Sequence, residues 1–177
     1  EDAIAGALDI IAENISDNAK YRKQIKRTCY LEGMITTKAT KPEEKSSYEM
    51  YYDFSEPIPK MVSHRILATN RGEKEGILKV QLVVDETLIE RYFHRQLIKE
   101  ADSLVAALVV AAYQDAYKRF IAPSVEREIR NALTEEADEQ AIAIFGENLR
   151  HLLLQSPLKG KVVLGFDPAY RTGCKLA

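Results

Sequence analysis

The sequence predicts a mainly α-helical, multi-helix domain with a small β-strand pair and a truncated β-hairpin at its C-terminus. Apolar residues recur every three or four positions through most of the chain, which is the period of an amphipathic helix. Strict alternation is clearest where Leu78, Val80 and Leu82 alternate with Lys79 and Gln81, as in a half-buried strand. Helix pairs that lead into a strand also resemble a helix-turn-helix arrangement.

The first half of the chain predicts helices separated by short extended segments. Ser16 and Asp17 are expected to cap the second helix, Gly33 to end it, and Ser63 to cap the helix before the alternating strand. The predicted order is helix 3–14, helix 18–32, strand 34–39, polar turn 40–47, a short helix containing the aromatic residues of 48–54, helix 63–74 and strand 77–84.

From residue 86 to the C-terminal hairpin the chain predicts helices alone. The segment 104–112 is apolar on nearly every side, so we expect this helix to be buried on most of its faces. Pro123 suits the first turn of a helix, and Thr134 followed by two glutamates predicts a fresh N-cap with a bend or boundary there. The predicted order is helix 86–99, helix 104–112, and a helix from Pro123 whose apolar stripe continues to Gln155.

The end of the chain predicts a strand, a turn and a returning strand. Residues 162–166 are a run of β-formers that ends in Asp167 and Pro168, and Gly173 stands on the far side of a polar turn. Such a hairpin cannot bury its apolar faces alone. We therefore expect the chain to be cut just inside a following domain, and Glu1 in place of an initiator Met suggests a cut at the other end. The predicted division is a helical domain over 1–156, and a linker with the first hairpin of a truncated RNase-H-like domain over 157–177.

Composition limits the class of protein. The 177 residues are 46% hydrophobic, which supports a folded core and argues against disorder. The formal net charge is −2, so any nucleic-acid contact has to come from a local patch. Two sparse cysteines suit a reducing cytoplasm. The longest apolar run is well short of the ~20 residues that span a bilayer. The sequence thus predicts a soluble cytoplasmic protein without a membrane partner.

Several stretches, in order, resemble one family. V-L-G-F-D-P-A-Y-R-T-G-C-K-L-A at residues 163–177 resembles the start of the YqgF/RuvC-type domain of the Tex family of bacterial transcription accessory proteins. S-H-R-I-L-A-T-N-R-G-E-K-E-G-I-L at residues 63–78 resembles a second signature of that family, and D-F-S-E-P precedes it at residues 53–57. Residues 7–16 and 125–154 also fit, so the resemblance covers nearly the whole chain.

The resemblance carries expectations for function. It implies a role in transcription, and similarity to eukaryotic elongation factors of the Spt family. It implies RNase-H-like, helix-hairpin-helix and OB-fold modules downstream, the OB-fold module binding RNA, and an RNase-H-like domain that is degenerate as a nuclease. RNA or another single-stranded nucleic acid, and the transcription machinery, are the partners that it implies for the full-length protein.

Asp167 is the sharpest catalytic candidate. RuvC-type nucleases place a carboxylate on their first strand to hold Mg²⁺, but the chemistry needs at least two further carboxylates from later elements. Since one carboxylate makes a poor Mg²⁺ site, capping of the turn before Pro168 is the favoured role. His64, His94 and His151 have no Cys or His at zinc-ligand spacing. We therefore predict no metal, no cofactor and no enzymatic activity for this chain.

Four basic residues form the candidate nucleic-acid site: Arg65, Arg71, Lys74 and Lys79. On a helix, Arg71 and Lys74 share a face, and Lys79 follows on the next strand, where all could contact phosphates. In the competing interpretation Arg65 and Arg71 pair with acids between helices, and Glu73 and Glu75 neutralise the basic residues around them. That interpretation is favoured, because charges on helices usually form a solvated face.

Two further groups bear on nucleic-acid binding. Tyr48, Tyr51 and Tyr52 would stack on bases in a single-strand binder, but aromatic residues at this spacing are more often buried. A set of acidic residues in the late helices would repel nucleic acid, and we expect it to face solvent or a protein partner. Its members are Glu126, Glu128, Glu135, Glu136, Asp138 and Glu139.

Three functional hypotheses follow, in this order of preference. The chain is a helical scaffold that holds the RNA-binding modules of a Tex-like protein. Alternatively, it is itself a nucleic-acid-binding module that uses Arg65, Arg71, Lys74 and Lys79. The third is a nuclease function through Asp167 in the full-length protein.

Overall fold

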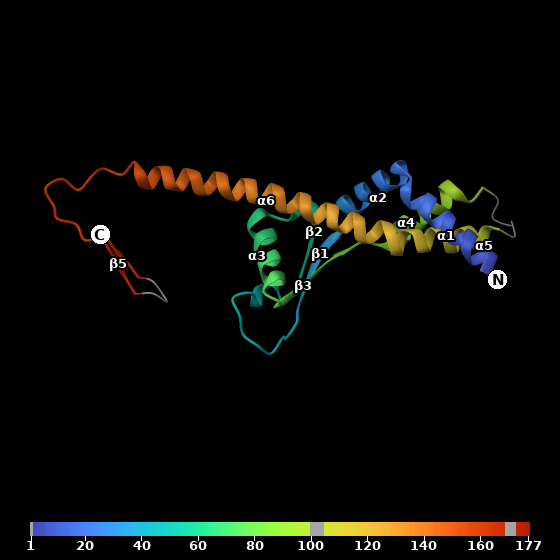
Figure 1. The fold of residues 1–177 in the computed structure, drawn as a ribbon, viewed down its shortest axis with the longest axis horizontal. Coiled ribbons are helices and arrows are strands. Elements are labelled where there is room, and N and C mark those ends of the chain that lie inside the picture. The colour runs from blue at the N-terminus through green and yellow to red at the C-terminus, as the bar shows by residue number, and fades with distance from the viewer. Residues whose placement is uncertain (1, 100–104, 169–172) are drawn as a thin grey trace. The chain divides into compact units, whose positions relative to one another are not determined.

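The computed structural model describes residues 2–99, 105–168 and 173–177 and has the predicted mainly α-helical fold class (Figure 1). The chain divides into two compact units, residues 1–142 and 143–177. The elements are α1 (Asp2–Asp17), α2 (Ala19–Glu32), β1 (Met34–Ala39), η1 (Glu49–Tyr51), β2 (Asp53–Pro57), η2 (Ile58–Lys60), α3 (Ser63–Lys74), β3 (Leu78–Val83), α4 (Glu86–Leu97), α5 (Ala106–Asp115), η3 (Ala116–Ile121), α6 (Ala122–Leu153), β4 (Phe166–Asp167) and β5 (Lys175–Leu176).

The first two helices meet at Asn18, which caps α2. Its side-chain Oδ1 accepts hydrogen bonds from the backbone N–H groups of Lys20 at 3.0 Å and Tyr21 at 3.4 Å. The predicted cap at Ser16 and Asp17 is therefore wrong by one residue, because Ser16 instead donates to a carbonyl within α1. Helix α2 ends at Gly33 as predicted, and the chain continues directly into β1.

A three-stranded antiparallel sheet of order β2-β1-β3 follows these helices. The two predicted strands pair directly, with Thr37 of β1 opposite Val80 of β3. The third strand, β2, pairs with the other side of β1 and places Phe54 opposite Thr37. The prediction of one aromatic helix over 48–54 is therefore wrong at its end: only Glu49–Tyr51 is helical, and Phe54 lies in a strand. Its ring still packs edge-on against Tyr51, with 5.5 Å between ring centroids.

Helix α3 covers one face of the sheet. Val80 and Leu78 of β3 are buried beneath it, 5% and 3% exposed. The helix approaches the sheet closely at Gly72, where a Cβ atom would lie only 2.6 Å from Leu78 Cδ1. The helix ends at a turn through Gly76, whose φ of +75° suits glycine. Gly76 is thus the stop signal that the sequence predicts. Ser63, predicted as the N-cap of this helix, makes no capping bond and contacts Gln140 instead.

Helices α2, α4 and α5 share an aromatic core. Phe93 is fully buried, stacks on Tyr113 at a centroid distance of 5.4 Å, and meets Tyr21 edge-on at 5.8 Å. The prediction that segment 104–112 is buried on most faces is wrong for its described residues, since Val105 and Leu108 are 56% and 37% exposed. Helix α5 packs mainly against α1 and α4, which leaves the rest of its apolar surface uncovered.

Helices α5 and α6 are continuous through the π-helical segment η3. Pro123 follows this segment and has no N–H group to bond the carbonyl of Arg119, as an α-helix requires. The N–H of Ala122 bonds instead to the carbonyl of Tyr117, five residues back. The wider turn therefore lets one long helix pass a proline without ending.

Helix α6 runs unbroken through Thr134, where the sequence predicts a new N-cap and a bend. This prediction is wrong: Thr134 Oγ1 donates to the carbonyl of Arg130 at 2.8 Å, one turn back inside the same helix. Packing overrides the local capping signal. The buried side of α6 consists of Val125, Ile129, Leu133 and Ala137.

The second unit contains the end of α6 and the short antiparallel pair β4–β5. The predicted strand over 162–166 is paired only from Gly165, which exchanges two backbone hydrogen bonds with Ala177 at 2.7 and 3.0 Å. Gly173 has a φ of +79°, in keeping with its predicted turn position, while turn residues 169–172 lie outside the described part. The domain boundary between residues 156 and 157 stays a prediction.

Candidate nucleic-acid interface

Arg65 lies on α3 and is engaged by the sheet. Its guanidinium donates to the Glu56 carboxylate of β2 in an ion pair, and lies 6.0 Å from the centroid of the Phe54 ring. The Glu56 side chain is 17% exposed, so the pair is partly shielded from water. Arg65 therefore joins α3 to β2, and its hydrogen bond and charge interaction with Glu56 raise its pKa above the ordinary arginine value.

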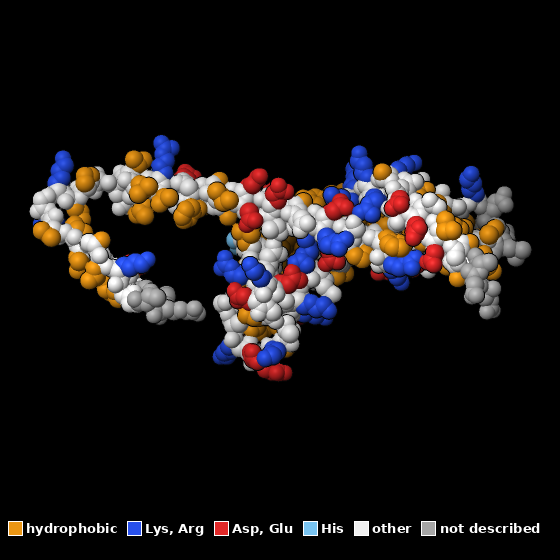
Figure 2. Space-filling view, in the orientation of Figure 1, with side chains coloured by type: hydrophobic (Ala, Val, Ile, Leu, Met, Phe, Trp, Pro, Cys, Tyr) orange, Lys and Arg blue, Asp and Glu red, His pale blue; other side chains and the backbone are white. Residues whose placement is uncertain are grey.

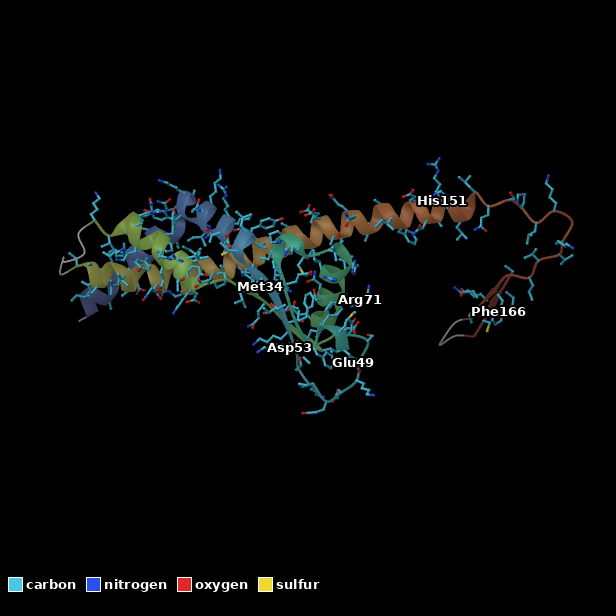
Figure 3. All side chains as sticks on the ribbon, turned by 180° about the vertical axis from the view of Figure 1, so that it is seen from behind. Met34, Glu49, Asp53, Arg71, His151 and Phe166 are labelled. Carbon is cyan, nitrogen blue, oxygen red and sulfur yellow. The ribbon has the colours of Figure 1, made fainter. Side chains whose placement is uncertain are left out.

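Arg71 and Lys74 are both exposed, and their spacing of three residues places them on one side of α3. Figure 3 labels Arg71 on this helix. Neither Arg71 nor Lys74 forms an ion pair with a carboxylate of the residues that the structure describes. Around α3, basic and acidic side chains are interspersed (Figure 2). These two residues are thus the part of the predicted site that is free to meet a phosphate.

Lys79 lies on the opposite face of the sheet from α3. Its neighbours Leu78 and Val80 face the helix and are buried, whereas Lys79 is exposed. It stands directly opposite Lys38 on β1, and Lys38 in turn stands opposite Asp53. The structure therefore does not bring Lys79 together with Arg71 and Lys74 on one surface.

Glu73 of α3 joins helix to helix and helix to strand. Both of its carboxylate oxygens accept from the guanidinium of Arg130 on α6, and its Oε1 also accepts from the Val80 N–H at 3.4 Å. On the same edge of β3, Glu126 of α6 accepts from the Leu82 N–H at 3.1 Å. Two carboxylates thus occupy donors that an edge strand would otherwise expose. Sequence reasoning missed this contact because Glu73 and Arg130 are 57 positions apart.

Basic residues of α2 are also paired across elements. Arg22 and Lys26 both contact Glu128 of α6, at 3.1 and 2.9 Å. These hydrogen bonds and charges lower the pKa of Glu128, the contact with Lys26 contributing most. The expected solvent-facing acidic set is confirmed for its exposed members Glu135, Glu136, Asp138 and Glu139. Glu126 departs from the expectation, because it is half-buried and bonded to β3, and Glu128 is exposed but paired with α2.

The three tyrosines Tyr48, Tyr51 and Tyr52 do not form an exposed platform for stacking on bases. Tyr48 and Tyr51 are each 7% exposed and pack with Leu78 in a small core of their own. Tyr52 donates its hydroxyl to the Glu44 carbonyl in the polar turn. The expectation that these aromatic residues are buried is therefore confirmed for Tyr48 and Tyr51.

Asp167 lies on β4 in the second unit and is exposed. It pairs in register with Lys175 of β5. Across the described ranges, no group of three or more His, Cys, Asp and Glu side chains is arranged to hold a metal ion. None of the helices in those ranges combines the length and apolar character needed to cross a membrane.

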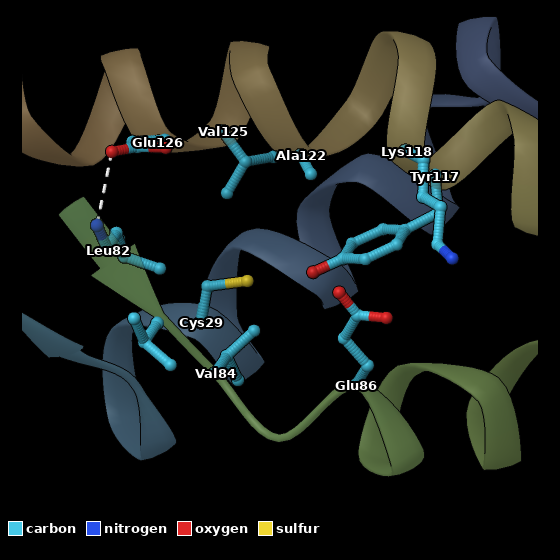
Figure 4. A pocket seen from close by; sticks show the side chains of 10 residues that line it. Cys29, Leu82, Val84, Glu86, Tyr117, Lys118, Ala122, Val125 and Glu126 are labelled. Atoms are coloured by element: carbon cyan, nitrogen blue, oxygen red, sulfur yellow. Dashed lines mark hydrogen bonds between the residues drawn. The ribbon is translucent and has the colours of Figure 1, made fainter.

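A pocket of about 310 Å³ lies beside the π-helical segment, between α2, the β3–α4 connection and α6 (Figure 4). Cys29 and Tyr117 line it, with Glu86 and Glu126 as its acidic groups. Burial raises the pKa of the Cys29 thiol to about 11, and burial also raises the pKa of Tyr117. Both groups therefore keep their protons at neutral pH, so the thiol is not a ready nucleophile.

Comparison with known proteins adds the family. Residues 1–145 match the family described as Tex central region-like. The chain belongs to the Tex family. It is 54% identical to YdcI of Bacillus subtilis, covering 100% of this chain and 25% of that protein. It is 33% identical to the transcriptional accessory protein Tex of Neisseria gonorrhoeae, covering 99% of this chain and 24% of that protein. It is also 33% identical to S1 RNA-binding domain-containing protein 1 of Homo sapiens, covering 81% of this chain and 15% of that protein.

This Tex-family chain thus spans about a quarter or less of the length of these relatives. In its first unit, the predicted basic site is divided between a cross-element ion pair at Arg65, an open helix surface at Arg71 and Lys74, and the far side of the sheet at Lys79.

Proposed function

We propose that this chain is the helical scaffold of a nucleic-acid-binding transcription accessory protein, and that it has no catalytic activity of its own. The relatives support the wider role, since one is named as a transcriptional accessory protein and another for an S1 RNA-binding domain. In this proposal the full-length protein works in the cytoplasm, and its partners are RNA or another single-stranded nucleic acid and the transcription machinery.

The observation that carries the scaffold role is the use of charge between elements. Glu73 bonds Arg130 and β3, Glu56 bonds Arg65, and Glu128 bonds two basic residues of α2. These contacts engage basic side chains that would have to be exposed on a phosphate-binding surface. They also fix α2, α3 and the sheet to the one long helix α6, as a rigid support requires.

A second candidate function is direct nucleic-acid binding through Arg71 and Lys74. It is favoured by one observation: both cations are exposed and lack ion-pair partners within the described ranges. Such residues would neutralise phosphates and make binding strongly dependent on salt.

A charge-reversal experiment separates the two functions. Labelled single-stranded RNA is titrated at low salt with the parent chain, with Arg71→Glu/Lys74→Glu, and with Lys20→Glu/Lys23→Glu as a control of equal charge change on exposed positions of α2. The scaffold role predicts that fluorescence anisotropy gives the same titration for both variants. A loss of more than about tenfold in affinity for the α3 variant alone would establish direct binding there.

A further inference from the structure

We propose that the groove between α2 and α4 is a docking site for an acidic amphipathic helix of a protein partner. The groove has a volume of about 510 Å³ and is lined by Arg27 and Leu31 from α2 and by Leu88, Arg91, Tyr92 and Arg95 from α4. On each helix the lining positions are three or four residues apart, so that one stripe of each helix faces the groove. The proposal extends the scaffold role by giving the scaffold a partner surface.

The charge of the groove is positive in a chain of net negative charge. Three arginines line it against one glutamate, Glu32. Arg27, Arg91 and Arg95 are exposed, and none forms an ion pair with a carboxylate of the described residues. Arg91 Nε donates to the Thr87 carbonyl at 3.3 Å, and its two terminal amino groups donate no hydrogen bond to any residue that the structure describes.

Two other cations of α2 are paired within the unit. Arg22 and Lys26 point to α6 and are both held by Glu128. In the groove, Glu32 is the acid that lines it from α2 and Asp85 interacts electrostatically with Arg91, but neither forms an ion pair with the three arginines. A carboxylate-bearing partner would supply such ion pairs, because guanidinium groups bind carboxylates through paired hydrogen bonds.

Apolar side chains between the arginines favour a peptide over nucleic acid. Leu31 is 50% exposed, and Leu88 and Tyr92 are half-buried. Tyr92 is held edge-on by Tyr21, with ring centroids 6.2 Å apart. Arginine and tyrosine are enriched in protein interfaces, where lysine is depleted. A helix that lays apolar residues into a groove and acidic residues on its rim fits this surface, whereas phosphate binding does not require an apolar floor.

The test uses a fluorescein-labelled synthetic helix of about 14 residues, with leucines on one face and glutamates elsewhere, and a matched peptide with lysine in place of glutamate. We expect the parent chain to bind the acidic peptide and not the basic one. Arg27→Glu/Arg95→Glu should weaken binding by at least about tenfold, because it reverses the charge opposite the glutamates. Arg71→Glu/Lys74→Glu, with the same change of charge on α3, should leave it unchanged. Leu31→Gln should weaken it without a change in charge.

Three results would overturn the proposal. They are no binding of the acidic peptide at low salt, equal weakening by the two double variants, and binding of a uridine oligonucleotide that is lost only in Arg27→Glu/Arg95→Glu. The last would make the groove a nucleic-acid site. The milder variant Arg27→Gln/Arg95→Gln, checked by circular dichroism, gives the same comparison if charge reversal disturbs folding. RNA binding lost only at Arg71 and Lys74 would contradict the scaffold role and leave this site standing.

Discussion

At the scale of single residues, Glu73 is a charge that joins α3 to both α6 and β3. Its carboxylate meets the Arg130 guanidinium through both oxygens and also accepts from the edge of β3. The side chains of Arg130 and Glu73 are 24% and 36% exposed, so water screens the pair only partly. Removing one partner leaves the other charge with fewer bonds than it has in the native state.

We therefore expect Glu73→Ala to lower the free energy of unfolding by about 1–3 kcal/mol, since it removes charged hydrogen bonds and a partner of β3. The double variant with Arg130→Ala should lose less than the sum of the single losses, as measured by urea denaturation in a double-mutant cycle. The control is Glu44→Ala, whose partner Lys41 is 68% exposed and which should cause no measurable change. Additive losses at Glu73 and Arg130 would contradict the coupling.

Cys29 gives a prediction for pH. Burial raises its pKa from 9.0 to about 11, so between these values the folded protein holds a proton that the unfolded chain releases. Stability is therefore undiminished below pH 9 and falls as the pH rises toward 11. Between pH 9 and pH 11 the free energy of unfolding should therefore fall by about 2 kcal/mol less in Cys29→Ala than in the parent. Chemical denaturation at several pH values measures it. A parallel pH dependence in both proteins would show that Cys29 does not titrate in this way.

At the scale of elements, α6 differs between its two halves. Its first half buries a stripe that ends at Ala137, whereas Phe145 and Leu152 in the second half are 67% and 61% exposed. Hydrophobic side chains are visible along that second half in Figure 2. Apolar side chains therefore continue along the whole helix, but only those of its first half are buried.

The same substitution should destabilise the fold strongly in the first half of α6 and hardly at all in the second half. Leu133→Ala removes a side chain that is 7% exposed and should cost about 2–5 kcal/mol. Leu152→Ala should change the free energy of unfolding by less than about 0.5 kcal/mol, because the site is on the surface and alanine favours helix. Thermal unfolding of both variants measures the difference. A comparable loss at Leu152 would mean that this half is buried in solution.

Local pattern was enough to predict most elements, and distant contacts explain the failures. The alternation around Val80 and the stop at Gly76 act within a few residues, so β3 and the end of α3 could be predicted. The local sequence predicts that Phe54 belongs to an aromatic helix, but pairing with β1 makes it part of a strand. Thr134 carries a capping signal that helix packing overrides. For the same reason the contacts of Glu126 and Glu128 were missed, since their partners lie on β3 and α2, whereas Glu135, Glu136, Asp138 and Glu139 are exposed as expected.

At the scale of the whole molecule, the candidate basic residues could be predicted from the sequence. Their distribution over different surfaces could not. A net charge of −2 leaves no general attraction for nucleic acid. In the first unit, Arg65 joins α3 to β2 and Arg130 joins α6 to α3, while Arg71 and Lys74 stay open. The central claim is that this chain supports nucleic-acid-binding modules and does not itself hold the nucleic acid.

The most direct test of this claim is a titration of labelled single-stranded RNA with the unmodified 177-residue chain, followed by fluorescence anisotropy at low and at near-physiological salt. The scaffold role predicts no binding that survives at near-physiological salt. Tight binding at that salt, weakening steeply as salt rises further, would show true phosphate contacts and contradict the claim.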